Sequence, residues 1–219
     1  MIITIDGPAA AGKGTLSQKL AQKYKLAYFD TGMIYRAVGL DLILKNFDPE
    51  DDIQSLKSAE NMTFSKMMEL SKHVDFRSNI GGQAASKVAA KTPVRQVLLK
   101  MQQDFALNPQ FPDGQQAEGV VYDGRDTGTV VCPNADIKIF ITASPEVRAM
   151  RRHKEFLAKG MDSDYEDVLA QTKERDLRDA SRASAPLKPA DDAIIIDTSD
   201  LAIEDVFNRV CKVIDDKNR

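Results

Sequence analysis

The chain has 219 residues, of which 42% are hydrophobic and 29% charged, and its formal net charge is −3 at pH 7. This composition is typical of one medium-sized globular domain and excludes a largely disordered chain. The slight acidic excess gives no bulk attraction for nucleic acid or an anionic membrane, and no apolar run approaches the ~20 residues of a membrane-spanning helix. The two cysteines, Cys132 and Cys211, are too few for a disulfide framework or a four-ligand zinc site. We expect a cytoplasmic protein that acts as a monomer, with neither a nucleic-acid nor a membrane partner.

Short β-branched runs alternate with helical periodicities along the chain. This alternation is typical of an α/β fold with a parallel sheet built from strand–helix units. Near-continuous apolar runs are expected where both faces of a strand are buried. Strands are predicted at residues 2–6, 26–30, 120–123, 137–142 and 193–197.

Two helices stand out by their apolar periodicity. After Pro93, apolar residues recur at helical spacing as far as Phe105. The last helix of the chain has a similar buried stripe, and Ser199 precedes it as a candidate cap.

One long stretch interrupts the alternation of strands and helices. Residues 47–107 lack a clear strand and are largely helical, which predicts a lobe inserted into a core made of residues 1–46 and 118–219. Residues 108–119 are predicted to form a loop, because their Pro and Gly residues break both periodicities.

The strongest signal is a phosphate-binding loop between the first predicted strand and the helix after it. Four residues separate Gly7 from Gly12 and Lys13, which is the P-loop spacing. Small residues let successive backbone N–H groups turn toward phosphate oxygens, and the helix N-terminus adds partial positive charge. Lys13 supplies a point charge for the β- and γ-phosphates. The expected ATP-binding residues are Gly7, Pro8, Ala9, Ala10, Ala11, Gly12, Lys13, Gly14 and Thr15.

The end of this loop departs from the usual P-loop. Gly14 stands where Ser or Thr is common, so Thr15 is the nearest hydroxyl for Mg²⁺. This Gly-Lys-Gly-Thr variant resembles nucleoside monophosphate kinases more than GTPases. Asp123 ends a predicted strand, where P-loop proteins place the acidic partner of Mg²⁺. We expect Mg²⁺ as the cofactor with ATP, and Thr15 and Asp123 as its ligands.

Three polar clusters suggest where an acceptor binds. Thr31 follows the second strand, at the edge where α/β folds bind ligands, although a helix-capping role is equally compatible. Ser86 and Arg95 lie nine residues apart, and Arg95 taken alone is more often a solvated helix arginine. Residues 122–131 follow a strand and combine charges with glycines, which is unusual for a purely structural turn.

A fourth cluster is rich in arginine. Arg175 and Asp179 are spaced i, i+4, and Arg178 and Arg182 fall in the same helix sector as Arg175. A solvated, salt-bridged face is the usual explanation for such a run. A kinase, however, must gather two phosphate-bearing ligands that repel each other, and converging guanidinium groups meet that need. Three more arginines lie upstream: Arg148, Arg151 and Arg152.

Together these segments resemble the bacterial cytidylate kinases, a branch of the nucleoside monophosphate kinases. The resemblance extends from Met1 to about Leu187, and the block Asp-Gly-Arg-Asp-x-Gly-Thr-Val-Val at 123–131 is among its most specific parts. It implies a P-loop NTPase fold: a parallel central sheet flanked by helices, a mostly helical nucleotide-binding lobe, and a short lid near 148–180. It also implies ATP-dependent, in-line phosphorylation of CMP and dCMP to CDP and dCDP, with ATP and CMP or dCMP as small-molecule partners.

The resemblance further implies a role for each matching residue. The catalytic residues are expected to be Lys13, Arg125 and Arg182. The acceptor's phosphate is expected to bind Arg36, Arg125 and Arg182, its base Ser86, Arg95 and Asp126, and its ribose Arg175 and Asp179. Thr31 is placed on the acceptor side as well. The lid is expected to carry Arg148, Arg151 and Arg152.

Two alternatives remain at this point. The chain could be a P-loop kinase for another nucleoside monophosphate or small acceptor, or a nucleotide-binding module without catalysis. The presence of both Lys13 and Asp123 weighs against the second. The family usually carries a longer, strand-containing insert before its Ser…Arg pair, and residues 74–82 show no such element.

Overall fold

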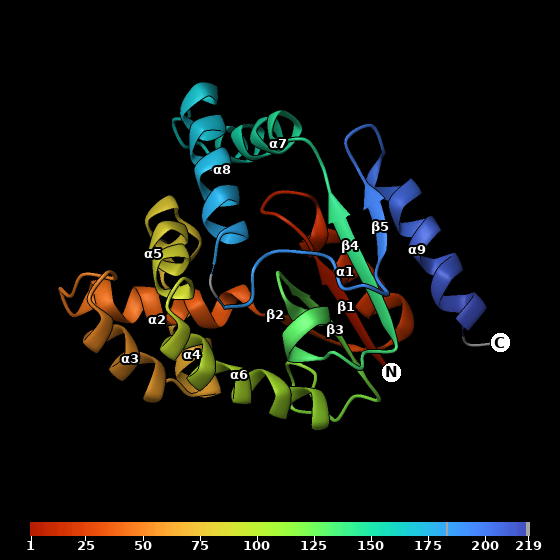
Figure 1. Ribbon diagram of the computed structural model, residues 1–219, viewed down its shortest axis with the longest axis horizontal. Helices are drawn as coiled ribbons and strands as arrows, with labels where there is room; N and C mark the ends of the chain where they lie inside the picture. Colours follow the sequence, from red (N-terminus) through yellow and green to blue (C-terminus); the bar gives the residue numbers. More distant parts are fainter. Residues whose placement is uncertain (183, 218–219) are drawn as a thin grey trace. The chain divides into compact units, whose positions relative to one another are not determined.

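A computed structural model of the chain describes residues 1–182 and 184–217 and divides it into two compact units. The first unit combines Met1–Phe29 with Asn108–Arg219, and the second is Asp30–Leu107. Figure 1 follows the chain through both. No helix in the described ranges is long and apolar enough to cross a membrane.

The first unit is built on a five-stranded sheet with the order β2-β3-β1-β4-β5. β1 pairs in parallel with β3 and β4, and β4 pairs in parallel with β5. All five predicted strands form, with small shifts at their ends. Their bounds are β1 Ile2–Asp6, β2 Ala27–Asp30, β3 Val120–Gly124, β4 Ile137–Thr142 and β5 Ile194–Asp197.

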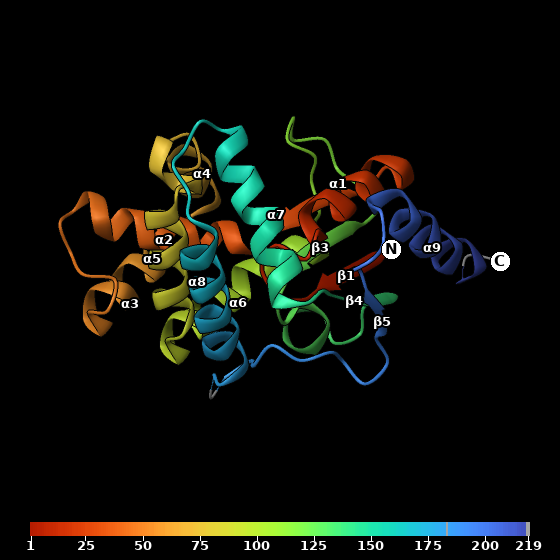
Figure 2. The same ribbon diagram turned by 90° about the horizontal axis from the view of Figure 1, so that it is seen from above.

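Side chains alternate between the two faces of the central strand. Ile3 and Ile5 are fully buried in a core shared with α1 (Lys13–Tyr24) and α9 (Ile203–Lys217). Figure 2 shows these two helices along the same face of the sheet. Thr4 and Asp6 therefore point to the opposite face, where β1 packs against a single π-helical turn, η2 (Thr127–Val131).

Two further helices of this unit form an antiparallel pair outside the sheet. α7 (Pro145–Ala158) begins with Ser144 as its cap, and α8 (Tyr165–Ala180) begins with Asp164 as its cap. Ala149 and Phe156 of α7 pack with apolar residues of α8 in a small core of their own.

The predicted cap of the last helix is wrong. α9 starts at Ile203, whereas the hydroxyl of Ser199 donates to Asp197 Oδ1 at 2.7 Å and accepts from the backbone N–H of Ser144 at 3.0 Å. Ser199 therefore links the ends of two neighbouring strands, because both lie at the same edge of the parallel sheet.

The second unit is helical, as expected for an inserted lobe. Its helices are α2 Gly32–Leu44, α3 Asp52–Glu60, α4 Phe64–Leu70, the 3₁₀ turn η1 Val74–Arg77, α5 Asn79–Ala89 and α6 Thr92–Leu107. The region 74–82, where the sequence showed no strand-containing element, forms η1 and the start of α5.

The boundary of this unit lies earlier than the predicted one at about residue 47. The buried carboxylate of Asp41, on α2, accepts from Ser58 Oγ at 2.7 Å and pairs with Lys66 Nζ at 2.9 Å. These contacts join α2 to α3 and α4, and α2 also packs against α5. α2 therefore belongs to the helical unit, and the unit begins at Asp30.

Candidate active site

The loop between β1 and α1 has the backbone of a phosphate cradle. Gly7 has a φ of +147°, and a Cβ there would lie 1.9 Å from the carbonyl oxygen of Ile141, so only glycine fits. Ala10 and Gly12 also have positive φ values, of 59° and 95°. Left-handed residues within a loop turn backbone N–H groups toward one centre, in front of the N-terminus of α1.

Lys13 lies inside this loop and is 5% exposed. Its ammonium donates to the carbonyl oxygen of Pro8 at 2.9 Å and lies 3.8 Å from Asp123 Oδ1. Tyr28 donates its hydroxyl to the other oxygen of Asp123 at 3.4 Å. Lys13, at the start of α1, and Asp123, near the end of β3, are thus brought together, although they were predicted for different roles.

Gly14 rather than Thr15 faces the carboxylate of Asp123. A Cβ on Gly14 would lie 3.3 Å from Asp123 Oδ2, whereas the side chain of Thr15, one position further along the helix, is exposed. Within the described ranges no three His, Cys, Asp or Glu side chains gather into a metal-binding group. Asp123 is the carboxylate that a cation next to the cradle could bind.

One buried carboxylate gathers three arginines of the predicted acceptor site. Asp179, on α8, is 1% exposed; Arg125 Nε donates to its Oδ2 at 3.1 Å, and Arg182 Nη2 donates to its Oδ1. Arg175 Nε lies 4.0 Å from Oδ2. Burial by itself raises the pKa of Asp179, but the positive charges of the three arginines outweigh it and hold this pKa below its usual range. The cluster keeps an excess of positive charge, which suits an anionic ligand.

Arg178 lies on the same helix. Its guanidinium bonds to Glu174 in an i, i+4 ion pair that is partly open to solvent. This contact is of the kind expected on a salt-bridged helix face.

The segment after β3 is held by a carboxylate that sequence analysis missed. Asp6 Oδ1 accepts from the backbone N–H of Thr127 at 2.9 Å and from its hydroxyl at 2.8 Å, and Oδ2 accepts from the N–H of Gly128 at 2.7 Å. Burial is the main cause that raises the pKa of Asp6, the charge of Asp126 adds to it, and the three hydrogen bonds oppose it. The only sequence signal is a charged residue at the end of an otherwise apolar strand.

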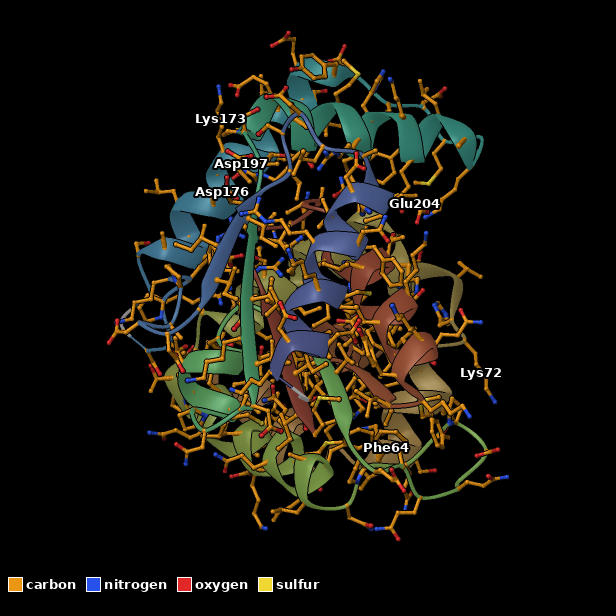
Figure 3. All side chains as sticks on the ribbon, turned by 90° about the vertical axis from the view of Figure 1, so that its right-hand side faces the viewer. Phe64, Lys72, Lys173, Asp176, Asp197 and Glu204 are labelled. Atoms are coloured by element: carbon orange, nitrogen blue, oxygen red, sulfur yellow. The ribbon has the colours of Figure 1, made fainter. Side chains whose placement is uncertain are left out.

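The three arginines expected in a lid all lie on α7, in different surroundings. Arg148 is 3% exposed and forms a bidentate pair with Asp176 of α8, at 2.9 and 2.6 Å; Figure 3 labels Asp176 on its helix. Arg148 also donates to the carbonyl oxygens of Ala143 and, at 3.4 Å, of Ala9 in the cradle. The pairing with Asp176 was not among the contacts expected from the sequence. Arg151 donates to Thr198, and Arg152 pairs with Glu155 and lies over the ring of Phe156.

The remaining predicted residues belong to the second unit. Arg36 donates to the carbonyl oxygen of Phe76 at 3.1 Å, and a Cβ on Gly82 would lie 3.5 Å from its Nη1. Ser86 follows Gly82 by one helical turn on α5 and is buried. Thus Arg36 and Ser86 both lie along α5.

Two of the simpler explanations weighed for this unit are wrong. Arg95 is not a solvated helix arginine: it is 6% exposed, donates to the carbonyl oxygen of Ala89 at 3.1 Å, and lies 5.3 Å from the ring centroid of Tyr35. Thr31 precedes α2 but its side chain does not cap the helix, and Asp30 accepts from the N–H of Gly32 instead.

The fold and the cradle together define an α/β protein of the P-loop class. A solved shikimate kinase from Bacteroides thetaiotaomicron has a similar fold, with a TM-score of 0.51 and 14% identity over 98% of each chain. The family model for cytidylate kinase matches residues 3–216. The chain belongs to the cytidylate kinase family.

Individual relatives agree over nearly their full lengths. A cytidylate kinase from Paramagnetospirillum magneticum is 48% identical over 216 residues, which cover 99% of this chain and 98% of the relative. Cytidylate kinases from Xanthobacter autotrophicus and Rhodospirillum rubrum are each 45% identical, over 98% and 100% of this chain and 97% and 99% of the relatives.

Proposed function

We propose that this chain transfers the γ-phosphoryl group of ATP to the phosphate of CMP or dCMP, forming ADP and CDP or dCDP. The observation that carries the proposal is the cluster of arginines around Asp179, in the same unit as the phosphate cradle. A phosphate acceptor needs its negative charge compensated, and guanidinium groups can each bind two of its oxygen atoms. Membership of the cytidylate kinase family supports the same acceptor class.

On the donor side, the backbone N–H groups of the cradle bind the phosphates of ATP and Lys13 follows the transferred group. Phosphoryl transfer requires little covalent chemistry from a protein, so catalysis consists of in-line placement and charge stabilisation. The buried position of Lys13 supports this role, because its charge acts at short range where water screens it little.

On the acceptor side, Arg125 and Arg182 bind the phosphate of CMP, and Arg36 adds a third guanidinium. Their carboxylate partner Asp179 and its neighbour Arg175 bind the ribose hydroxyls. Thr31 lies on this side as well. The lid region near 148–180 closes over the nucleotides and excludes water, which prevents hydrolysis of ATP.

The base is distinguished by hydrogen-bond polarity. Cytosine offers an exocyclic amine beside ring acceptors, while uracil offers a ring N–H and a carbonyl in their place. Asp126 accepts from the amine, and Arg95 and Ser86 donate to the acceptors. A buried site built for one pattern can reject the other by up to about 10⁴-fold, because mismatched polar groups stay unpaired.

Mg²⁺ fits the donor site. The carboxylate of Asp123 lies next to Lys13 and faces the start of α1, and Mg²⁺ is commonly bound by one or two carboxylates together with substrate phosphates. Asp123 is its main protein ligand in this proposal, with the hydroxyl of Thr15 as the second. When bound, the ion neutralises charge on the phosphates of ATP.

Initial rates of ADP formation with CMP, dCMP, UMP and AMP test the function. We expect high rates with CMP and dCMP and much lower rates with the others. The matched control is Lys13→Ala, which should lower turnover by about 10² to 10³-fold and so shows that the chain itself is the catalyst.

Other outcomes of this assay would favour one of the alternative functions or contradict a residue role. Comparable rates with UMP contradict the roles of Asp126 and Arg95, and a preference for AMP indicates a kinase for another nucleoside monophosphate. ATP binding without acceptor-dependent ADP formation would indicate a nucleotide-binding module.

A further inference from the structure

Asp6 holds both ends of a two-residue span that carries two acceptor-site side chains. In the register of the parallel sheet Asp6 is the partner of Gly124, the last residue of β3. Its carboxylate then accepts from Thr127, three residues further on. Only Arg125 and Asp126 lie between these two fixed points.

The segment that begins at Thr127 also packs closely against β1, in addition to its hydrogen bonds to Asp6. A Cβ on Gly128 would lie 2.9 Å from Thr4 Oγ1 and 3.4 Å from Asp6 Oδ2. The turn that follows closes on itself, because the carbonyl oxygen of Asp126 accepts from Val130 N–H at 2.8 Å. The backbone on the far side of the span is therefore fixed to β1 through Asp6.

We infer that Asp6 is a positioning residue for the acceptor, acting through the backbone of Arg125 and Asp126. This inference rests on the proposed function. Without the carboxylate, Thr127 and Gly128 lose their hydrogen bonds to β1, so the backbone that carries Arg125 and Asp126 is held less firmly, while the Arg125 side chain keeps its contact with Asp179. A displacement of about 1 Å in such a group can reduce catalysis by about a hundredfold.

Removing the carboxylate of Asp6 should weaken binding of the acceptor and not of ATP, although Asp6 directly precedes the donor cradle. The hydrogen bonds of its carboxylate go to Thr127 and Gly128, not to the cradle. The shape of the cradle depends instead on Gly7 and Gly12 and on the bond from Lys13 to Pro8.

Two variants and one control test the inference. Asp6→Asn keeps the shape of the side chain but presents an NH₂ group to one of the backbone donors, which breaks at least one hydrogen bond. Thr127→Val removes only the hydroxyl donor and serves if Asp6→Asn does not fold. The control is Asp136→Asn, because Asp136 accepts from the N–H of Ile2 at 2.7 Å and so anchors the opposite end of the same strand.

The measurements are kcat and KM for CMP with ATP, and calorimetric binding of CMP and of ATP alone. For Asp6→Asn we expect kcat/KM for CMP to fall about a hundredfold and the Kd for CMP to rise about tenfold, while the Kd for ATP changes less than about threefold. Thr127→Val should weaken CMP binding about fivefold in the same selective way. The control should match the wild type.

A purely structural role for Asp6 predicts something different: a smaller active fraction, with the Kd for both ligands unchanged. That result overturns the inference, and so does an equal loss of ATP and CMP binding. A wild-type chain that does not phosphorylate CMP refutes the proposed function and this inference with it. A wild type that does, combined with an unaltered Asp6→Asn, refutes the inference alone.

Discussion

The side chain of Asp179 is the buried counter-ion of three arginines. Guanidinium groups gathered for a phosphate repel one another before the ligand arrives, and a carboxylate in their midst reduces that repulsion. The arrangement leaves excess positive charge while keeping Arg125 and Arg182 oriented. A pocket can thus be stable without its ligand and still attract an anion.

This counter-ion role predicts a distinctive pH dependence of stability. Asp179→Asn should lower the free energy of unfolding at pH 7 by about 3 kcal/mol, because it leaves buried guanidinium groups without their carboxylate. The folded-state pKa of Asp179 lies below its unfolded value of about 3.9, so this stabilisation is fully present above that value. It is lost only as the pH falls through the lower, folded-state pKa.

Urea denaturation of the wild type and Asp179→Asn between pH 7 and about pH 4.5 checks this, with a constant difference expected. Asp104→Asn is the matched control, since Asp104 pairs with Lys100 at the exposed surface of α6 and its loss should change the free energy of unfolding little at any pH in this range. A difference that disappears near pH 6 would contradict the assigned pKa direction.

The site residues predicted best from the sequence are the arginines, because binding a phosphate requires positive charge. Arg125, Arg175 and Arg182 were expected in one site with Asp179, and the structure brings them together around its carboxylate. Asp6 escaped prediction because its partners are two backbone N–H groups and a hydroxyl far away in the sequence. No local pattern marks such a contact.

At the scale of elements, Arg148 joins α7, α8 and the cradle through one buried guanidinium. It bonds to Asp176 on α8 and to the carbonyl oxygen of Ala9. Around it, Lys173 of α8 and Glu146 of α7 form a second, exposed pair at 3.1 Å. The orientation of the helix pair therefore depends chiefly on the buried bidentate contact.

Replacing Arg148 should weaken the α7–α8 pair. Arg148→Met keeps the volume but leaves Asp176 without its partner, and we expect a loss of about 2–3 kcal/mol in the free energy of unfolding. The free energy of unfolding of Arg148→Lys should lie between those of the wild type and Arg148→Met, because an ammonium cannot reproduce the bidentate geometry.

Thermal and urea denaturation measure these losses. The control Lys159→Ala removes an exposed pair between Glu155 of α7 and the residue that follows the end of this helix, and should cost less than about 1 kcal/mol. Equal effects of Arg148→Met and Lys159→Ala would show that the buried contact is not what joins the helices.

The elements themselves were predictable, and their boundaries less so. Apolar runs marked all five strands. The expectation of burial on both faces holds for β3 but not for the edge strand β5, where Ile194 and Ile195 are exposed. The start of the helical unit was misplaced because α2 reads as an ordinary helix following β2. Contacts of Asp41 with Ser58 and Lys66 place α2 in the helical unit, and no sequence periodicity predicts them.

At the scale of the whole molecule, the central strand of the sheet comes first in the chain. β1 pairs with β3 and β4, which lie more than a hundred residues further on, and the helical unit intervenes between them. Contacts within the helical unit, such as those between α2 and α5, span shorter stretches of chain.

This order predicts the sequence of folding events. Because loop closure costs more entropy for distant contacts, the helical unit should form before the central sheet. Pulsed hydrogen exchange during refolding should find amide protons of α2 and α5 protected earlier than those of β1 and β3. Earlier protection of β1 would show that the sheet nucleates folding despite its long-range pairing.

The same feature has a consequence during translation. After Asp6 has been added, the ribosome must synthesise 136 more residues to reach Thr142 and complete both neighbours of β1. At typical speeds this takes on the order of ten seconds. Throughout that interval the apolar strand β1 is without its two neighbouring strands, which exposes the nascent chain to aggregation until β4 has been made.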